Sequence, residues 1–121
     1  MISKEIFTMK YIVAIIQPDC LNAAMDELGE QGVDLVTVTE VMGHGRQKGE
    51  AQVYRGHKEA GRLLRKIKLE IAVNDDYVDK TISAITTATR TEQIGDGKIF
   101  VLPLEQCARI RTGEVGPVAI G

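Results

Sequence analysis

Three basic or glycine-rich segments hold the residue types in this chain that most suggest chemistry. Residues 43–49 are Gly-His-Gly-Arg-Gln-Lys-Gly, residues 95–98 are Gly-Asp-Gly-Lys, and residues 109–111 are Arg-Ile-Arg. Glycines let a backbone approach a ligand closely, and adjacent backbone N–H groups with a lysine can hold a phosphate. Two arginines two residues apart on a strand would share one face, where an anion relieves their repulsion.

Each segment also has a plainer interpretation. The first could be a flexible glycine hairpin, because its GxGxxxG spacing is not the dinucleotide-binding fingerprint and no helix follows it. The second could be an ordinary Asp-Gly turn, and the third a pair of solvated arginines. All three lie at expected strand ends in a chain of net charge −2. A shared polyphosphate, most simply a nucleotide, would explain them together, with Asp96 orienting its loop or contacting a ribose.

Composition limits the remaining classes of function. The chain has 121 residues, of which 44% are hydrophobic and 26% charged, as expected for one globular domain. Its slightly acidic charge argues against a general nucleic-acid partner, and no apolar run is long enough for membrane insertion. It has no Trp, three Tyr and two Phe, so its core must be aliphatic, and oligomerisation often supplements such a core.

The sequence offers no metal centre or catalytic constellation. Cys20 and Cys107 form no CxxC motif, and His44 and His57 do not complete a zinc spacing. Two reduced thiols and an N-terminus without an apolar signal core predict a cytoplasmic protein. Because no nucleophile–base pair is recognisable, the chain is not expected to be an enzyme.

The positioning elements follow from hydrophobic periodicity. A β-α-β pattern, a long loop and a second β-α-β pattern predict an α+β, ferredoxin-like βαββαβ fold, with helices on one face of an antiparallel sheet. The other face is expected to be apolar and covered by another subunit. The predicted strands are 11–16, 33–41, 66–73 and 98–102. The predicted helices run from a cap at Asp19 to stops at Gly29 and Gly32, and along a stripe of Val78, Ile82 and Ile85 to about Arg90.

The segment from Gly43 to about Leu64 has no clear period. A stretch of about 20 irregular residues is unusual in a compact domain and is usually functional. We therefore expect an arm that a ligand could order, with a tolerated insertion as the alternative.

These residues closely resemble the PII signal-transduction proteins of nitrogen regulation. The resemblance rests on residues 37–49, 54–56, 94–101 and 110–114, and extends from Met9 to Glu114. It implies a homotrimer with the sheets inside, ATP and ADP competing for clefts between subunits, and 2-oxoglutarate bound beside Mg-ATP. It also implies a T-loop, about residues 44–64, that docks on an ammonium channel or another transporter, or on a nitrogen-metabolism enzyme.

The resemblance divides the chain into a domain at residues 9–114, an extension or mis-assigned start at residues 1–8, and a flexible tail at residues 115–121. It also assigns ligand positions. The nucleotide positions are Ile15, Thr37, Gly43, Gly45, Arg46, Gln47, Glu70, Gly95, Asp96, Gly97, Lys98, Arg109 and Arg111, the two arginines reaching into the neighbouring subunit's cleft. The 2-oxoglutarate positions are Gln47, Lys48, Gly49 and Lys66, with Gln47 also a magnesium ligand. The partner-binding positions are Tyr54, Arg55 and Gly56.

Departures from the family pattern bear on regulation. Glu59 stands where enteric members have the uridylylated tyrosine, and His57 where cyanobacterial members have the phosphorylated serine. We therefore predict no covalent modification of the T-loop. Gln17 replaces a common lysine and Glu92 a common glycine. Because the T-loop is divergent, the alternative is a PII-like adenylate sensor with another second ligand or client, in carbon uptake, polyamine uptake or nitrogenase control.

Overall fold

The computed structural model describes residues 8–45, 53–54, 57–58 and 62–121. The predictions for Arg46, Gln47, Lys48, Gly49, Arg55, Gly56 and Glu59 lie outside the described residues.

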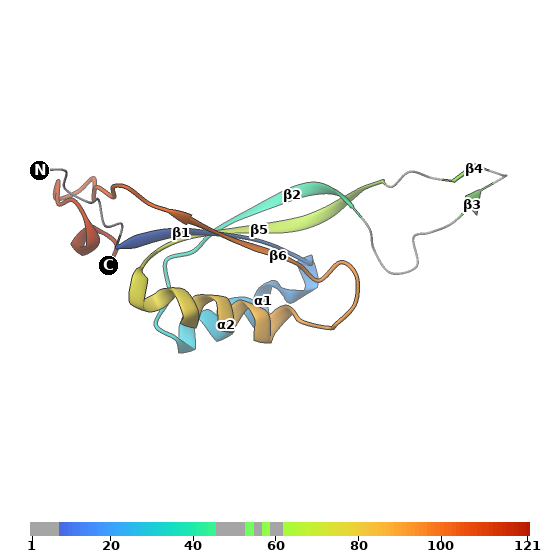
Figure 1. Cartoon of the computed structure of the whole chain (residues 1–121), viewed down its shortest axis with the longest axis horizontal. Coiled ribbons are helices and arrows are strands. Elements are labelled where there is room, and N and C mark those ends of the chain that lie inside the picture. The colour runs from blue at the N-terminus through green and yellow to red at the C-terminus, as the bar shows by residue number, and fades with distance from the viewer. Residues whose placement is uncertain (1–7, 46–52, 55–56, 59–61) are drawn as a thin grey trace, which may run out of the picture.

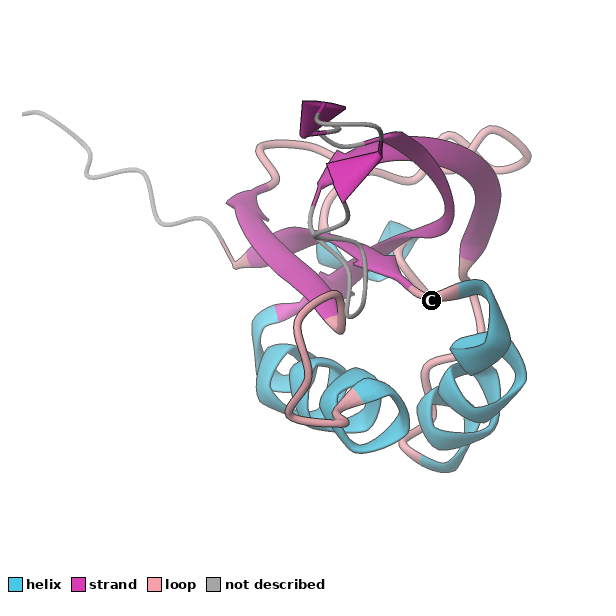
Figure 2. Ribbon diagram, turned by 90° about the vertical axis from the view of Figure 1, so that its right-hand side faces the viewer, coloured by secondary structure: helices cyan, strands magenta, loops and turns pink. Residues whose placement is uncertain are grey.

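The described elements form two layers, a four-stranded sheet and a pair of helices (Figures 1 and 2). All neighbouring strands are antiparallel, in the order β2-β5-β1-β6, and both helices cover the same face. The predicted α+β, ferredoxin-like fold is therefore confirmed. The main elements are β1 (Met9–Ile16), α1 (Leu21–Glu30), β2 (Thr37–Gly45), β3 (Val53–Tyr54), β4 (His57–Lys58), β5 (Arg62–Asn74), α2 (Val78–Thr89) and β6 (Gly97–Pro103). Short 3-10 turns span Pro18–Cys20, Asp75–Tyr77 and Pro117–Ala119.

The core lies between the sheet and the helices and is aliphatic, as the composition predicts. Alternate residues of β1 and β5 face the helices, because successive side chains of a strand point to opposite faces. Burying each large aliphatic side chain stabilises the fold by about 1.5–3 kcal/mol. The cluster contains Ile12, Ala14, Ile16, Ala24, Leu28, Val33, Ile67, Leu69, Ile71, Val73, Ala84 and Ile85.

The buried stripe of α2 differs from the prediction. Ile85 is buried, but Val78 and Ile82 are only partly so, whereas Thr81 and Thr89 are buried. The two threonine hydroxyls donate to carbonyl oxygens one turn earlier, at 2.7 and 2.8 Å. These bonds satisfy the hydroxyls, so the threonines can replace larger apolar residues at the helix contact.

The ends of α1 also correct the prediction. Gly29 lies inside the helix, and Gly32, with φ +79°, follows its end. The N–H of Val33 donates to the carbonyl of Leu28 at 2.9 Å, a helix stop that needs a left-handed residue. Asp19 is not the cap, because Cys20 is the N-cap residue of α1, and the Cys20 side chain accepts no cap hydrogen bond.

Strand pairing continues into the segment predicted to be an irregular loop. The second strand begins at Thr37 rather than residue 33 and continues to Gly45, opposite Arg62 of β5. The backbone ladder does not depend on side-chain alternation, so it runs on through the glycines that interrupt the sequence pattern. The resulting β2–β5 ribbon extends beyond the helical layer, and β3 and β4 form a small separate pair (Figure 1).

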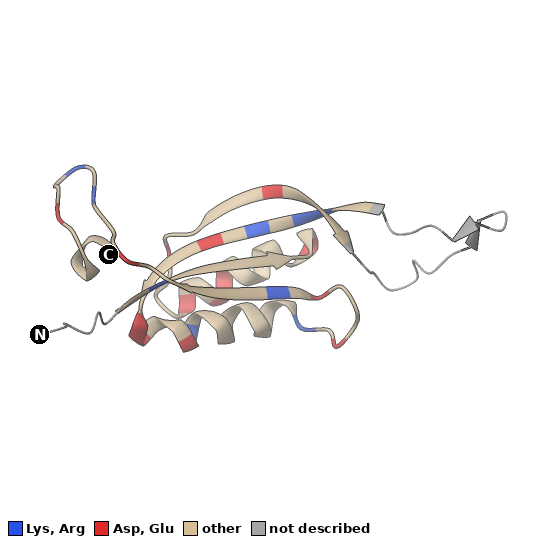
Figure 3. Cartoon of the chain, turned by 45° about the horizontal axis from the view of Figure 1, so that its top comes forward, with Lys and Arg blue, Asp and Glu red and all other residues tan. Residues whose placement is uncertain are grey.

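The sheet face away from the helices, here called the open face, is only partly apolar. β1 contributes Tyr11, Val13 and Ile15, whereas β5 contributes Lys66, Lys68 and Glu70 (Figure 3). The expectation of an apolar face was therefore wrong along β5. The physical reason is alternation: because the isoleucines and leucine of β5 face the core, its charged residues must occupy the other face.

The C-terminal segment has defined structure. Residues 109–111, expected to be a strand, form a turn after the bridge between Ala108 and Val115. Residues 115–121, expected to be a flexible tail, include the 3-10 turn Pro117–Ala119, and Ala119 is buried. A run of small and apolar residues can thus pack locally even without a helical or strand period.

Candidate functional site

Three lysines gather on the open face around Ile15. In the strand register, Ile15 lies opposite Lys98 of β6 on one side and Lys68 of β5 on the other. Lys66 precedes Lys68 by two residues and therefore faces the same way. We call Lys66, Lys68 and Lys98 the basic corner. Like charges this close on one sheet face favour an anionic ligand.

Lys68 was not among the residues predicted from the sequence. Its ammonium lies 3.6 Å from the carboxylate of Glu70, so its charge is partly balanced within the strand. The signal that could have found it is the spacing itself, since Lys66, Lys68 and Glu70 alternate with core residues along one strand.

The turn before β6 lies against the end of β1. Gly95 and Gly97 have φ values of +101° and +117°, which side-chain-bearing residues rarely adopt. A β-carbon on Gly97 would lie 2.0 Å from the carbonyl oxygen of Ile15. The side-chain amide of Gln17 donates to the carbonyl of Gly95 at 2.7 Å. Gly97 thus lets the turn approach β1, Gly95 supplies a second positive φ within the turn, and the Gln17 hydrogen bond holds the turn against β1.

Asp96 organises the same turn. Its carboxylate accepts the backbone N–H groups of Thr91 at 2.7 Å and Glu92 at 2.9 Å, and also the Thr91 hydroxyl. These hydrogen bonds, the hydroxyl of Thr91 first among them, lower the pKa of Asp96 below its usual value. Of the two roles considered for Asp96, orientation of the loop is the one visible in its contacts. Thr91 was not predicted as its partner.

Gly43 lies beside Lys66 at the base of the β2–β5 ribbon. A β-carbon at Gly43 would lie 3.4 Å from Cγ of Lys66, which is an ordinary van der Waals contact. The Lys66 stem thus lies against β2 at this glycine. Gly45, the next predicted glycine, is paired with Arg62 at the end of the described ribbon.

Glu70 joins a hydrogen-bonded group in the middle of the open face. It lies opposite Thr37 in the register and accepts a hydrogen bond from the Tyr11 hydroxyl. That hydrogen bond lowers the pKa of Glu70, and the nearby charge of Lys68 lowers it further. The same hydrogen bond raises the pKa of Tyr11. Tyr11 was not predicted, because its alternation within a continuous apolar run gives no sign of a polar partner.

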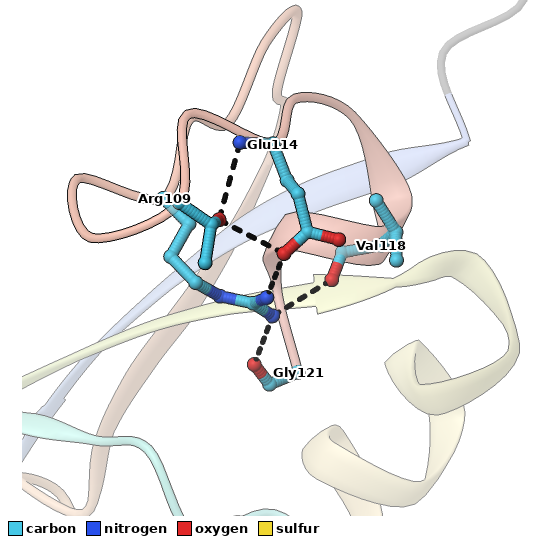
Figure 4. Close-up of polar contacts among 5 residues, drawn as sticks. Arg109, Glu114, Val118 and Gly121 are labelled. Carbon is cyan, nitrogen blue, oxygen red and sulfur yellow. Dashed lines mark hydrogen bonds and ion pairs between the residues drawn. The ribbon is translucent and has the colours of Figure 1, made fainter.

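Arg109 and Arg111 lie in very different surroundings. The guanidinium of Arg109 forms an ion pair with Glu114 and donates to the oxygens of Val118 at 2.9 Å and Gly121 at 2.7 Å (Figure 4). Arg111 is exposed in the following turn and forms no hydrogen bond or ion pair with the residues that the structure describes. In the sequence the two arginines look equivalent, and the partners of Arg109 were not predicted.

The two halves of the predicted nucleotide site lie at opposite ends of β6. The glycine turn at residues 95–97 leads into β6, and the arginines follow Pro103 at the other end of the molecule (Figure 1). Seven strand residues span about 20 Å, so one chain does not bring Lys98 and Arg111 to a common phosphate. Of the predicted site residues, the fold brings Ile15, Lys66 and Lys98 together on the open face. It does not bring Arg109 or Arg111 to the same place within one chain.

Two classes of site lack candidates in the described part of the chain. No group of three or more His, Cys, Asp or Glu side chains gathers there as a metal site would require. No helix in the same part is long and apolar enough to cross a membrane. The predicted magnesium ligand, Gln47, lies outside the described residues.

Comparison with known proteins covers nearly the whole chain. The family model "Nitrogen regulatory protein P-II" matches residues 9–114. Nitrogen regulatory protein GlnK1 of Methanosarcina mazei is 49% identical over 114 residues, covering 93% of this chain and 97% of that protein. Nitrogen regulatory protein P-II of Bradyrhizobium diazoefficiens is 50% identical over 112 residues, covering 93% and 100%.

A solved structure shares the fold. The crystal structure of Arabidopsis thaliana PII bound to citrate superposes with a TM-score of 0.74 at 34% identity, covering 93% of this chain and 90% of that one. The strand order, the matched residues and the identities to curated relatives agree. The chain therefore belongs to the P-II family of nitrogen regulatory proteins, which are signal transducers rather than enzymes.

Proposed function

We propose that this P-II protein senses ATP and ADP together with 2-oxoglutarate, and controls a transporter or enzyme of nitrogen metabolism through its T-loop. The observation that carries the proposal is the basic corner, where lysines from two strands face one side of the sheet around Ile15. Beside it, Gly97 lets the turn at residues 95–97 reach the end of β1. A glycine turn with adjacent lysines suits a polyphosphate.

The working form is a homotrimer with nucleotide sites between subunits. Because Lys98 lies at the start of β6 and Arg111 in the turn beyond its other end, a site that uses both needs two copies of the chain. Phe100 and Leu102 are 49% and 44% exposed on β6, which supports contact between the open faces. A head-to-tail contact of this kind closes into a ring, and the ring would hold one site at each contact.

The second ligand is 2-oxoglutarate, bound beside Mg-ATP. Lys66 would pair with one carboxylate, while Gln47, Lys48 and Gly49, the residues beyond the end of β2, would complete the site. A dianionic keto acid is well matched by an ammonium group and a divalent metal. The Arabidopsis relative is described as bound to citrate, another small polycarboxylate, and this supports a carboxylate effector here.

The partner is a membrane transporter, such as an ammonium channel, or an enzyme of nitrogen metabolism. The β2–β5 ribbon extends beyond the body of the domain and carries the predicted T-loop, with Tyr54, Arg55 and Gly56 as contact residues. A ligand that orders such a loop changes which partner can dock. The protein itself would act in the cytoplasm.

Calorimetry tests the proposal. We expect Mg-ATP to bind, 2-oxoglutarate to strengthen that binding, and Lys98→Ala to weaken it. Lys80→Ala is the matched control, because Lys80 lies on α2 over the ring of Tyr77, away from the basic corner. Nucleotide binding that is indifferent to 2-oxoglutarate would favour the alternative, an adenylate sensor with another second ligand. Absence of nucleotide binding would contradict both.

A further inference from the structure

The guanidinium of Arg109 is held by its own chain. It pairs with the carboxylate of Glu114 through Nη1, and through Nη2 it donates to the oxygens of Val118 and Gly121 at 2.9 and 2.7 Å (Figure 4). The Arg109 side chain is only 27% exposed. We call this set of contacts the C-terminal latch.

The latch occupies the hydrogen-bonding edges that a phosphate needs. Arginine binds phosphate in a bidentate manner through its Nη1–Nη2 edge or its Nε–Nη2 edge. Both edges include Nη2, and both hydrogens of Nη2 are used by the Val118 and Gly121 oxygens. Bidentate phosphate binding by Arg109 and closure of the latch are therefore mutually exclusive.

Glu114 gives the latch an anion of its own. Its carboxylate stands where a phosphate oxygen would pair with the guanidinium, and it also accepts a hydrogen bond from the Thr112 hydroxyl at 2.9 Å. The backbone N–H of Arg109 donates to the carbonyl of Glu114, and that of Gly113 to the carbonyl of Arg109, both at 2.8 Å. The turn thus presents the carboxylate to the arginine without help from a ligand.

We propose that residues 114–121 form an autoinhibitory segment, in which Glu114 and the oxygens of Val118 and Gly121 compete with nucleotide phosphate for Arg109. The inference rests on the proposed nucleotide function and adds a regulatory step to it. Binding a phosphate at Arg109 requires the segment to release, and closure of the segment lowers the affinity for nucleotide. Linkage requires the converse, that bound nucleotide favours the released segment.

Release has a local signature in the backbone. The N–H of Gly116 donates to the carbonyl of Cys107 at 2.8 Å, and the N–H of Ala119 to the carbonyl of Gly116 at 2.9 Å. Only the first bond joins the segment to the preceding chain, so amide exchange at Gly116 reports whether the segment is closed. We expect exchange at Gly116 to accelerate when Mg-ATP is added, while amides of α2 stay protected.

The test compares Glu114→Gln with Glu105→Gln by Mg-ATP calorimetry. Glu114→Gln keeps the shape of the latch and removes its charge, so we expect ATP affinity to rise about two- to fivefold, the range for one partly exposed ion pair. Glu105 is exposed before the bridge at Ala108 and forms no hydrogen bond or ion pair with Arg109, so Glu105→Gln makes the same charge change and leaves the polar contacts of the latch intact.

The outcomes separate the two proposals. A rise in affinity for Glu114→Gln alone, with faster exchange of the Gly116 amide on ATP binding, supports the latch. An unchanged or lower affinity for Glu114→Gln, in a wild-type protein that binds ATP, overturns the latch and leaves the nucleotide function standing. If the wild type binds no ATP, the proposed function itself fails.

Discussion

A β-carbon placed on Gly97 would lie 2.0 Å from the carbonyl oxygen of Ile15. Backbone and backbone meet at this point, so no rotamer change can make room. The contact joins the glycine turn to the strand that carries Ile15, and it explains why the sequence has glycine here. The candidate site is thus built first from main-chain packing and only then from its lysines.

Gly97→Ala tests this contact. We expect a loss of at least about 2–3 kcal/mol of unfolding free energy, because a backbone clash adds to the cost of a positive φ. Gly113→Ala is the matched control, since Gly113 also has a positive φ, +76°, but a β-carbon there would meet no atom within 4 Å. Urea denaturation measures both variants. Equal losses in the two would show that the contact with Ile15 contributes nothing.

Glu92 has a left-handed backbone, with φ +65°, a conformation that glycine adopts without strain. Glu92→Gly should raise the unfolding free energy by about 0.5–1 kcal/mol, because it relieves strain. The substitution also removes the ion pair between Glu92 and Arg90, at 3.2 Å, but an exposed pair of this kind contributes little to the unfolding free energy. Glu92→Ala removes the same pair but keeps the strain, so thermal denaturation should show no gain. A gain in unfolding free energy in both variants would show that relief of backbone strain at residue 92 is not its cause.

Asp96 makes stability depend on pH in the acid range. Hydrogen bonds from Thr91 and Glu92 lower its folded pKa below the ordinary aspartate value of 3.8. The contribution of Asp96 to folding stability is therefore present above pH 3.8. It is lost as the pH falls through that value toward the lower folded pKa. We expect Asp96→Asn to be less stable than wild type at neutral pH and to lose less on acidification. Asp26→Asn, on the exposed side of α1, should follow the wild-type profile, and a parallel profile for Asp96→Asn would contradict the assignment.

Tyr11 should ionise at an unusually high pH. Its hydrogen bond to Glu70 favours the neutral phenol and raises its pKa above 10.0. Ultraviolet titration of wild type and Tyr11→Phe isolates this tyrosine from Tyr54 and Tyr77. In Glu70→Gln the same transition should move down toward the ordinary value. No movement would mean that Glu70 does not control Tyr11.

The fold could be predicted because its core elements carry strong periodicity. The alternation of Ile67, Leu69, Ile71 and Val73 indicated both a strand and its buried face. The predicted extents were less accurate where pairing is a property of the backbone alone. The glycines of β2 interrupt the side-chain pattern, although the backbone pairing with β5 continues to Gly45. Gly29 likewise lies within α1, and the helix ends near Gly32 through a backbone hydrogen bond.

The candidate site could be predicted by residue type but not by arrangement. Gly97, Lys98 and Lys66 stand out in the sequence because glycine and lysine suit phosphate binding. The partners of Arg109 do not stand out in the sequence, because two of them are main-chain oxygens, which every residue has. The separation of the glycine turn from the arginines likewise becomes visible only when β6 is placed in the sheet.

In the proposed trimer, each nucleotide site takes its glycine turn from one chain and its arginines from another. Lys98→Ala and Arg111→Ala each alter one half, so each variant alone should bind ATP weakly. The two variants can be co-expressed with different tags and purified on both tags, which selects trimers that contain both variants. In each such ring, one contact joins the intact glycine turn of an Arg111→Ala chain to the intact Arg111 of a Lys98→Ala chain.

Calorimetry of those mixed trimers with Mg-ATP is the most direct test. We expect recovery of about one wild-type site per trimer, since one contact of three is intact on both sides. The claim would be contradicted by a mixture that binds ATP no better than its two parents, or by either parent retaining wild-type affinity.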